Sequence, residues 1–371
     1  MTRVLKPFDL QALSIFLCIK VALVTDPTCG SAGMLISCIA HLKSQGKEWR
    51  NLQVYGQEIN QLTSAIGRMN LFLHGIEDFH IVNDDTLKRP AFIENGQLKK
   101  FDIVLANPPY SISQWDRGAF ENDKYGRNKY GTPPQSRADY AFIQHIIASL
   151  KEKTGRAAIL LPHGVLNRGE EKEIRKAIVQ TDCVDAVIGL GRHLFYNSGL
   201  ESCIVVLRKN KPVAHRGTIL FIEAEKCTHK VQSQNYLFDE DIEKIINAYC
   251  SEIDIPNFSI RVSNSEILQN EGNLNIKLYV NSDTDSDNTD FSEALDNYLS
   301  SVNTRNSQGL MREESVWEKT DYSVTFDDFD KSSWKRVRLS DVAEEYSERV
   351  DDPSASDYEW YIVSAQQIGR C

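Results

Sequence analysis

Asn107, Pro108, Pro109 and Tyr110 follow directly after the apolar run Phe101–Ala106. Proline fixes its own backbone and keeps the preceding residue extended, so two prolines in series make a rigid proline corner (residues 107–110). In this corner the Asn107 side-chain oxygen and the Pro108 carbonyl can point at one place. Such acceptors suit an exocyclic amine on a base, because holding its two hydrogens favours the pyramidal form needed for attack. Tyr110 offers a flat face on which a planar base can stack.

A second stretch, DPTCGSAG, forms a small-residue turn (residues 26–33) between an apolar run and a helical pattern. Small side chains there let a ligand approach the backbone closely. The spacing does not match the phosphate-cradling GxxxxGK[ST] loop, and the dinucleotide pattern GxGxxG is absent. The turn alone fits nucleotide binding in general or a plain strand-to-helix connection.

Two acidic residues follow later strands. Glu58 ends the stretch LQVYGQEIN, where a carboxylate is suited to accept hydrogen bonds from ribose hydroxyls. Asp85 lies in NDDTL, after a third strand near His80–Val82, and its carboxylate can accept from an adenine amino group. A lone Glu after a strand is more often simply solvated, so both assignments depend on the small-residue turn.

Strand and helix patterns alternate between Val21 and Ala224 and position these residues. Apolar runs separated by helices predict a doubly wound, mostly parallel, seven-stranded α/β sheet, whose ligands bind at the carboxyl ends of its strands. The strand-length runs are Val21–Val24, Leu52–Tyr55, Phe101–Ala106, Ala157–Leu161, Val184–Leu190, Cys203–Leu207 and Thr218–Ile222. Helical patterns occupy Met34–Leu42, Gln61–His74 and Tyr140–Lys151.

The composition of the chain argues against several classes of protein. The chain has 371 residues, of which 41% are hydrophobic, and a formal net charge of −10, which argues against coating nucleic acid through bulk charge alone. Its eight cysteines are scattered without a CxxC pair, which predicts no zinc or other metal site and fits a reducing cytoplasm. The apolar stretch Phe8–Val24 carries Asp9 and Lys20, so we expect no membrane span.

The pattern divides the chain into five parts. Residues 1–23 form a short lead-in, and residues 24–225 form the α/β catalytic domain. Residues 226–282 form a helical extension, with Asp239 expected to cap a helix. Residues 283–333 form a polar, acidic linker, and residues 334–371 begin a further domain that is too short for a core of its own.

These motifs resemble those of the amino-group DNA methyltransferases that use S-adenosylmethionine, and more narrowly the modification subunits of type I restriction–modification systems. The family's cofactor loop is close to DPxCGSGG, and Ala32 here replaces a glycine, adding a methyl near the backbone that faces the cofactor. Its adenine-contacting stretch is close to GDTL, where this chain has Asp84. Residues 156–179, 184–209 and 257–280 also match, although Gly191 and Leu200-Glu201 replace the family's usual Pro and Ile-Pro.

The resemblance implies a site-specific enzyme that methylates the N6 amine of a flipped adenine in double-stranded DNA, in the cytoplasm, without a metal. Its partners would be a specificity subunit and a restriction subunit. Phe195 or Tyr196, in the stretch HLFYNSG, could form the other face of the base slot, although aromatic residues near strands more often belong to the core. Catalysis is assigned to Asn107, Pro108, Pro109 and Tyr110. S-adenosylmethionine binding is assigned to Asp26, Thr28, Cys29, Gly30, Ser31, Gly33, Met34, Glu58 and Asp85.

Two departures from the family lie at the ends of the chain. The family's helical N-terminal domain and its Phe-Thr-Pro stretch, which contacts the methionine end of the cofactor, have no counterpart in residues 1–23. We therefore expect a fragment or a disrupted reading frame. Residues 334–371 resemble the beginning of a target-recognition domain from a specificity subunit, which predicts a fused polypeptide that is broken off.

Two other functions stay open on the sequence. Asn-Pro-Pro-Tyr also occurs in enzymes that methylate the side-chain amide of protein glutamine, since an amide nitrogen poses a similar chemical problem. A chain without the N-terminal domain could also be an inactive remnant or a scaffold in a DNA complex.

Overall fold

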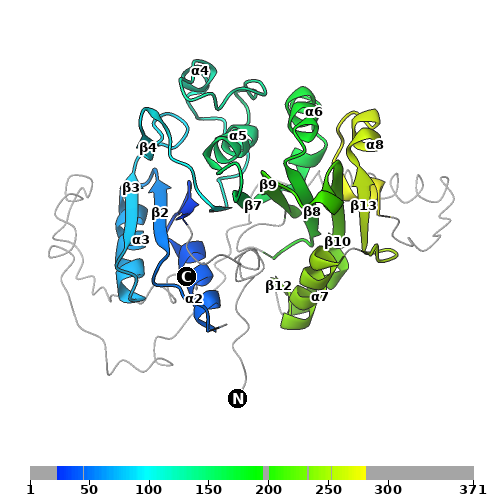
Figure 1. Cartoon of the computed structure of the whole chain (residues 1–371), viewed down its shortest axis with the longest axis horizontal. Helices are drawn as coiled ribbons and strands as arrows, with labels where there is room; N and C mark the ends of the chain where they lie inside the picture. The colour runs from blue at the N-terminus through cyan, green and yellow to red at the C-terminus, as the bar shows by residue number, and fades with distance from the viewer. Residues whose placement is uncertain (1–22, 45, 195–199, 232–233, 252, 281–371) are drawn as a thin grey trace, which may run out of the picture. The chain divides into compact units, whose positions relative to one another are not determined.

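A computed structural model describes residues 23–280 of the chain, apart from residues 45, 195–199, 232–233 and 252 (Figure 1). Most of the predicted lead-in, the polar linker and the target-recognition-like stretch lie outside the described residues, as do Phe195 and Tyr196.

A nine-stranded sheet forms the centre of the described region, with strand order β13-β10-β8-β9-β7-β6-β1-β2-β3. Strands β9 and β13 run antiparallel to their neighbours, and the others are parallel. The strands are β1 (Leu23–Asp26), β2 (Gln53–Glu58), β3 (Phe79–Asn83), β6 (Ile103–Ala106), β7 (Arg156–Pro162), β8 (Val184–Leu190), β9 (Ser202–Arg208), β10 (Thr218–Ala224) and β13 (Ser259–Ser263). The predicted doubly wound, mostly parallel architecture is confirmed.

The sheet has nine strands, two more than the seven predicted. The third strand expected near His80–Val82 is present as β3 at one edge, and β13 at the other edge was not expected. Strands β3 and β13 are only partly buried, whereas β6 and β8 are buried along their whole length. An edge strand shows a weaker apolar run, because one side of it meets solvent or loops. Periodicity therefore finds the central strands more readily than the edges.

Helices cover both faces of the sheet (Figure 1). Helices α2 (Gly33–Ser44), α3 (Gln61–Leu73) and α7 (Asp239–Cys250) contribute to one core cluster, and α5 (Asp139–Ser149), α6 (Lys172–Gln180) and α8 (Asn264–Gln269) to another. The sheet therefore separates two hydrophobic cores. Smaller elements are α4 (Arg117–Glu121), the hairpins β4 (Ile93–Glu94)–β5 (Gln97–Leu98) and β11 (His229–Val231)–β12 (Gln234–Tyr236), and the 3-10 turns η1 (His163–Leu166), η2 (Val213–His215), η3 (Glu225–Cys227) and η4 (Ile276–Leu278).

The start of α7 differs from the predicted cap. Phe238, rather than Asp239, occupies the N-cap position with an extended backbone, and its N–H donates to the Asp241 carboxylate at 2.9 Å. Asp239 is the first helical residue, where its negative charge favours the positive end of the helix dipole.

The connection between β8 and β9 has a different form from the helical crossovers elsewhere in the sheet. Because β9 is antiparallel, Leu190 at the end of β8 pairs with Ser202 at the start of β9. The connecting residues 191–201 thus leave and re-enter the sheet at the carboxyl end of β8.

Candidate active site

The strands that carry the two predicted motifs are neighbours in the sheet. Strand β1 pairs in parallel with β2 on one side and with β6 on the other. Asp26 ends β1, Glu58 ends β2, and Asn107 follows β6 directly. The small-residue turn and the proline corner therefore follow the carboxyl ends of adjacent parallel strands, so they lie on the same side of the sheet's end.

The small-residue turn presents its backbone to open space. Gly30 has a φ of +53°, which favours glycine. Apart from the adjoining backbone, no atom of the described residues lies within 4 Å of the position that a Cβ would take on Gly30 or Gly33. The Gly30 N–H donates to the Glu58 carboxylate at 3.0 Å, and the Cys29 N–H donates to the Gln57 carbonyl at 3.0 Å. These bonds hold the turn against β2 and leave its outer surface available to a ligand.

Three residues assigned to the cofactor loop have buried side chains. Ala32 adopts a φ of +64° and is fully buried, so its extra methyl packs into the core and does not face the site. Met34 and Cys29 belong to the same core cluster, so only their backbone groups can take part in binding. Ser31, in contrast, is exposed, and its carbonyl accepts from Asn70 at 3.0 Å.

Asp26 is buried at the base of the turn. One carboxylate oxygen accepts from the Thr28 N–H at 2.9 Å and lies 3.3 Å from the Thr28 hydroxyl. The other oxygen, Oδ2, is buried and has no hydrogen-bond partner among the residues that the structure describes. Burial raises the pKa of Asp26 to about 7, and the negative charge of Glu58 adds to this effect.

Glu58 lies in a fixed turn at the end of β2. Its two oxygens accept from the backbone N–H groups of Gly30 and Asn60, at 3.0 and 2.8 Å. The Asn83 side chain donates to the carbonyls of Glu58 and Ile59, at 2.8 and 2.9 Å. A carboxylate oxygen has capacity for a further donor, such as a ribose hydroxyl.

Ile59 is a candidate binding residue that the sequence reasoning missed. It follows Glu58 immediately and exposes 68% of its surface. An apolar side chain beside a ribose-binding carboxylate gives a purine ring a surface on which to pack. Its position just beyond the buried run of β2 is a signal in the sequence that could have identified it.

Asp85 lies in the Asp85 loop (residues 84–90), which is held against the small-residue turn. Its Oδ1 accepts from the N–H groups of Leu87 and Lys88, at 2.9 and 3.1 Å, which leaves Oδ2 without a hydrogen bond among the described residues. The Thr86 hydroxyl donates to the Pro27 carbonyl at 2.6 Å. The contact ties the two predicted halves of the cofactor site together.

The four residues of the proline corner differ in exposure. Asn107 is exposed, and its side chain makes no hydrogen bond within the described part of the chain. Pro108 is buried, Pro109 is exposed, and Tyr110 is half-buried against the first core cluster. Burial raises the pKa of Tyr110, so its hydroxyl stays neutral at ordinary pH.

A buried carboxylate anchors the residue that follows the corner. Ser111 adopts a φ of +51°, and its N–H and hydroxyl donate to the two oxygens of Asp139, at 2.9 and 3.2 Å. Arg168 donates to Asp139 at 2.6 Å and to the Ser111 hydroxyl at 3.1 Å. Asp139 is fully buried. This network, which no motif predicted, sets the direction in which the chain leaves Tyr110.

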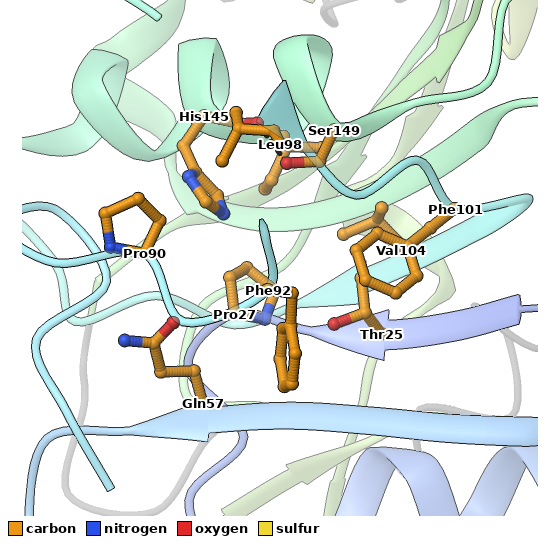
Figure 2. Close-up of a pocket in the computed structure, with 11 residues that line it drawn as sticks. Thr25, Pro27, Gln57, Pro90, Phe92, Leu98, Phe101, Val104, His145 and Ser149 are labelled. Carbon is orange, nitrogen blue, oxygen red and sulfur yellow. Dashed lines mark hydrogen bonds between the residues drawn. The ribbon is translucent and has the colours of Figure 1, made fainter. Parts of the chain in front are cut away.

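Two hollows among the described residues differ in size and in position. One cavity has a volume of about 10 Å³, which is room for about one water molecule. Figure 2 shows residues that line it, among them Thr25, Pro27, Gln57 and His145. A larger hollow of about 290 Å³ is lined by Leu52, just before β2, and by Asp78, just before β3. It therefore lies at the amino ends of these strands, away from the proline corner.

The described residues contain neither a cluster of metal ligands nor a helix that could span a membrane. Within residues 23–280, excluding the gaps given above, no three His, Cys, Asp or Glu side chains gather as metal ligands. No helix in this same part of the chain has the length and apolarity to cross a bilayer.

The residues at this edge fit an adenosyl cofactor and a planar amine. Open backbone at Gly30 and Gly33 gives room for a ligand, and Glu58 and Asp85 supply acceptors for hydroxyl and amino groups. Asn107 presents a free amide at the same edge. Such an arrangement can hold two reactants together, which lowers the entropic part of a transfer barrier.

Comparison with known proteins agrees with this geometry. A family model described as N-6 DNA Methylase matches residues 12–288. The chain is 37% identical over 270 residues to the type I restriction enzyme MjaVII methylase subunit of Methanocaldococcus jannaschii. The aligned stretch covers 69% of this chain and 45% of the relative. It is 34% identical over 278 residues to the MpnII methylase subunit of Mycoplasma pneumoniae, with 72% and 50% covered. The chain thus spans about half the length of the curated relatives it matches.

Solved structures give the same result. The methyltransferase subunit of a type I restriction-modification system from Streptococcus thermophilus matches with a TM-score of 0.67 and 35% identity, over 73% of this chain and 58% of that one. The EcoKI M protein matches with a TM-score of 0.60 over 88% of this chain and 76% of that one, and at 19% identity this likeness shows the fold alone.

Proposed function

The chain belongs to the N-6 DNA methylase family, and from that premise we propose that it transfers a methyl group from S-adenosylmethionine to the N6 amine of adenine in DNA. The observation that carries this proposal is the position of the free Asn107 amide, which follows the strand beside the small-residue turn. The catalytic and cofactor-binding assignments made from the sequence are part of the same proposal.

The residues of the chain supply binding and orientation. S-adenosylmethionine, when bound, supplies a methyl group activated by a positively charged sulfur. Glu58 and Asp85 accept hydrogen bonds from the ribose and adenine of the cofactor, and Ile59 packs on its base. Small residues at Gly30 and Gly33 leave the space that the cofactor occupies.

At the other half of the site, Asn107 and Pro108 hold the two hydrogens of the target amine with fixed acceptors. The lone pair of that nitrogen would thereby be freed from the ring for attack on the methyl carbon. The N–C bond would form as the S–C bond of the cofactor breaks, and the methylated amine would lose one hydrogen as a proton to solvent. Tyr110 stacks on the adenine, which must leave the duplex to reach the site. Since the Tyr110 hydroxyl stays neutral, the aromatic face carries its role.

The relatives are named as methylase subunits of type I restriction enzymes. By analogy we assign this chain to a modification complex in the cytoplasm, with DNA, a specificity subunit and a restriction subunit as partners. Fusion of residues 334–371 to a specificity module belongs to the same proposal and rests on the sequence resemblance alone.

Labelled S-adenosylmethionine tests the proposal directly. The chain is incubated with DNA of varied sequence or with protein substrates, and the products are digested and separated by mass spectrometry. We expect the label in N6-methyladenine. Label in glutamine would identify a protein methyltransferase. No binding of S-adenosylmethionine by calorimetry would identify a remnant or a scaffold, and either result would overturn the proposal.

A further inference from the structure

Arg127 carries a buried positive charge in the 112–138 segment (residues 112–138), which connects the proline corner to α5. It pairs with Asp123, with both side chains 2% exposed and 2.7 Å between Nη2 and Oδ1. The neighbouring His145 ring lies 3.4 Å from Nη1, and burial lowers its pKa to about 3, so this ring stays neutral. Buried charges are costly unless they are fully hydrogen-bonded.

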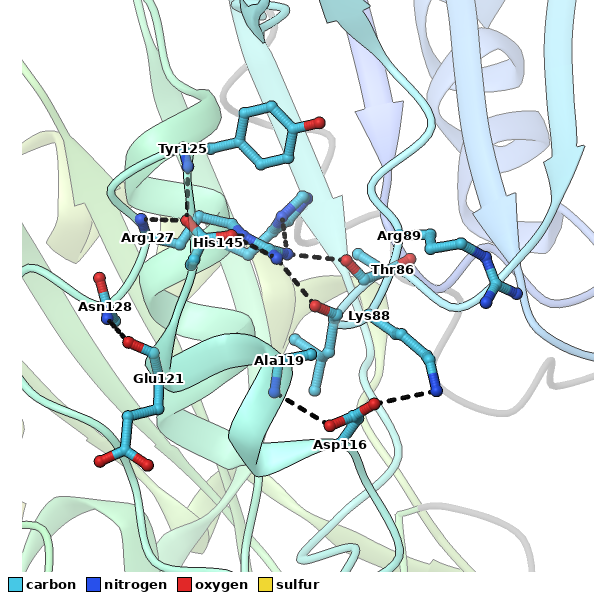
Figure 3. A network of polar contacts seen from close by, with 12 residues as sticks. Thr86, Lys88, Arg89, Asp116, Ala119, Glu121, Tyr125, Arg127, Asn128 and His145 are labelled. Atoms are coloured by element: carbon cyan, nitrogen blue, oxygen red, sulfur yellow. Dashed lines mark hydrogen bonds and ion pairs between the residues drawn. The ribbon is translucent and has the colours of Figure 1, made fainter.

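The remaining donors of Arg127 cross to the Asp85 loop (Figure 3). Nη1 donates to the Thr86 carbonyl at 2.8 Å, and Nη2 donates to the Leu87 carbonyl at 2.8 Å. A planar guanidinium suits this task, because it presents several donors in one fixed geometry. Arg127 thus joins the 112–138 segment to the loop that carries a proposed cofactor ligand.

The bonds within the loop pass this restraint on to Asp85. The Leu87 N–H donates to Asp85 Oδ1 at 2.9 Å, so the residue whose carbonyl Arg127 holds also orients the Asp85 carboxylate. Thr86, the other residue held by Arg127, reaches the Pro27 carbonyl of the small-residue turn. A shift of the Arg127 side chain would therefore move Asp85 relative to that turn.

Two further contacts join the same segments. Lys88 of the Asp85 loop pairs with Asp116 at 2.9 Å (Figure 3). Leu87 is 2% exposed and packs in a third core cluster with Trp115 and Phe120. The loop and the 112–138 segment therefore share apolar, ionic and hydrogen-bonded contacts, and Arg127 makes the buried polar part of them.

We propose that Arg127 is a positioning residue for the cofactor. Arg127 fixes the Asp85 loop to the segment that follows the proline corner. In this arrangement Arg127 fixes the position of the adenosine end of the cofactor site relative to the segment beside the target base. The inference rests on the proposed function, since it assigns Asp85 to S-adenosylmethionine.

A double-mutant cycle on cofactor affinity tests this role. S-adenosylmethionine is titrated by calorimetry into the wild-type chain, Arg127→Lys, Asp85→Asn and the double variant. Lysine keeps the charge opposite Asp123 but cannot bridge both carbonyls, so we expect each single change to weaken binding about tenfold. Because both act through Asp85, the double variant should bind no more than about twofold more weakly than either single one. Arg117→Lys, in the same segment, is the matched control and should bind like the wild type.

The outcomes separate the two proposals. If the wild-type chain does not bind S-adenosylmethionine, the proposed function fails and this inference fails with it. If the wild type binds and Arg127→Lys binds equally well, only the inference is overturned. Additive losses of about a hundredfold would also overturn it, because Arg127 would then act independently of Asp85.

A second variant covers the case in which Arg127→Lys does not fold, as judged by circular dichroism. Asp116→Asn keeps an oxygen for the Ala119 N–H at the start of α4 but removes the charge that faces Lys88. We expect it to weaken binding of S-adenosylmethionine about twofold, the size of an exposed ion pair. Unchanged affinity in this variant would overturn the inference.

Discussion

The N–H of Ser111 donates to the fully buried carboxylate of Asp139 at 2.9 Å, immediately after the proline corner. The two residues are 28 positions apart in the chain. The bond holds Ser111 in a left-handed conformation, with a φ of +51°. The direction of the corner therefore depends on a carboxylate at the start of α5 as well as on its prolines.

We predict that Ser111→Val slows methyl transfer at least about tenfold while the affinity for S-adenosylmethionine stays nearly unchanged. A β-branched residue at positive φ is strained by about 1–3 kcal/mol, and relief of that strain would turn the corner away. Ser111→Gly is the matched control, because glycine accepts this φ freely and keeps the N–H bond to Asp139. Single-turnover rates and calorimetry on both variants give the comparison, and equal rates for valine and glycine would contradict the prediction.

For Asn107→Ala we expect a loss of methyl transfer of about 10²-fold or more, with cofactor affinity nearly unchanged. The preorganised acceptor for the amine would be gone, and losing one group of this kind typically costs that much in rate. Asn107→Asp keeps the acceptor oxygen and replaces the amide NH2 with a second, charged acceptor oxygen, so its rate should fall between those of alanine and the wild type. Rates measured at saturating cofactor decide the matter, and full activity in the alanine variant would remove Asn107 from the mechanism.

Replacement of Glu58 should act on cofactor binding before it acts on rate. In Glu58→Gln one oxygen becomes an amide donor, so either the Gly30 or the Asn60 N–H loses its acceptor. We expect the dissociation constant for S-adenosylmethionine to rise about tenfold, with a rate at saturation within about threefold of the wild type. Glu77→Gln, an exposed carboxylate just before β3, serves as the control. A lower rate at unchanged affinity would contradict this assignment.

The buried Asp26 should make the stability of the fold depend on pH. Its pKa is about 7 in the folded chain, against 3.8 as the ordinary value, so the folded state holds a proton that the unfolded state releases. The stability that this proton gives is complete below about pH 4 and is lost as the pH rises through about 7. Each pKa unit corresponds to about 1.4 kcal/mol, so the whole effect amounts to a few kcal/mol.

Asp26→Asn removes this titration and keeps an oxygen for Thr28. We expect the melting temperature of the wild type to fall relative to the variant between pH 5 and pH 8. Thermal unfolding followed by circular dichroism at several pH values measures the difference, in which other titrating groups cancel. Melting curves that shift in parallel across this range would show that Asp26 does not hold the proton.

Local patterns predicted the parts of the site that local chemistry determines. The two prolines stiffen the backbone of the corner itself, and the glycines of the small-residue turn mark its open backbone. Ala32 shows where this reasoning stops. Its place in a glycine-rich motif pointed to the cofactor, but its methyl packs into the core because the chain turns inward there.

Contacts between segments that are distant in the sequence could not be predicted from it. Arg168 lies 57 positions from Ser111, and Arg127 lies 41 positions from Thr86. In the sequence each is one arginine among several charged residues of a loop. Only the packing of α5 and of the Asp85 loop brings these side chains to their acceptors. A single sequence shows which elements form, but these pairings depend on how the elements pack.

Because β9 runs antiparallel to β8, the connection between them begins and ends at the same end of the sheet. Leu190 and Ser202 are paired across the sheet, so the ends of their connection stay fixed whatever its length. Closing a loop twice as long costs only about 0.6 kcal/mol. Insertions between Leu190 and Ser202 are therefore tolerated in evolution, because β8 and β9 keep their register whatever the length of the connection.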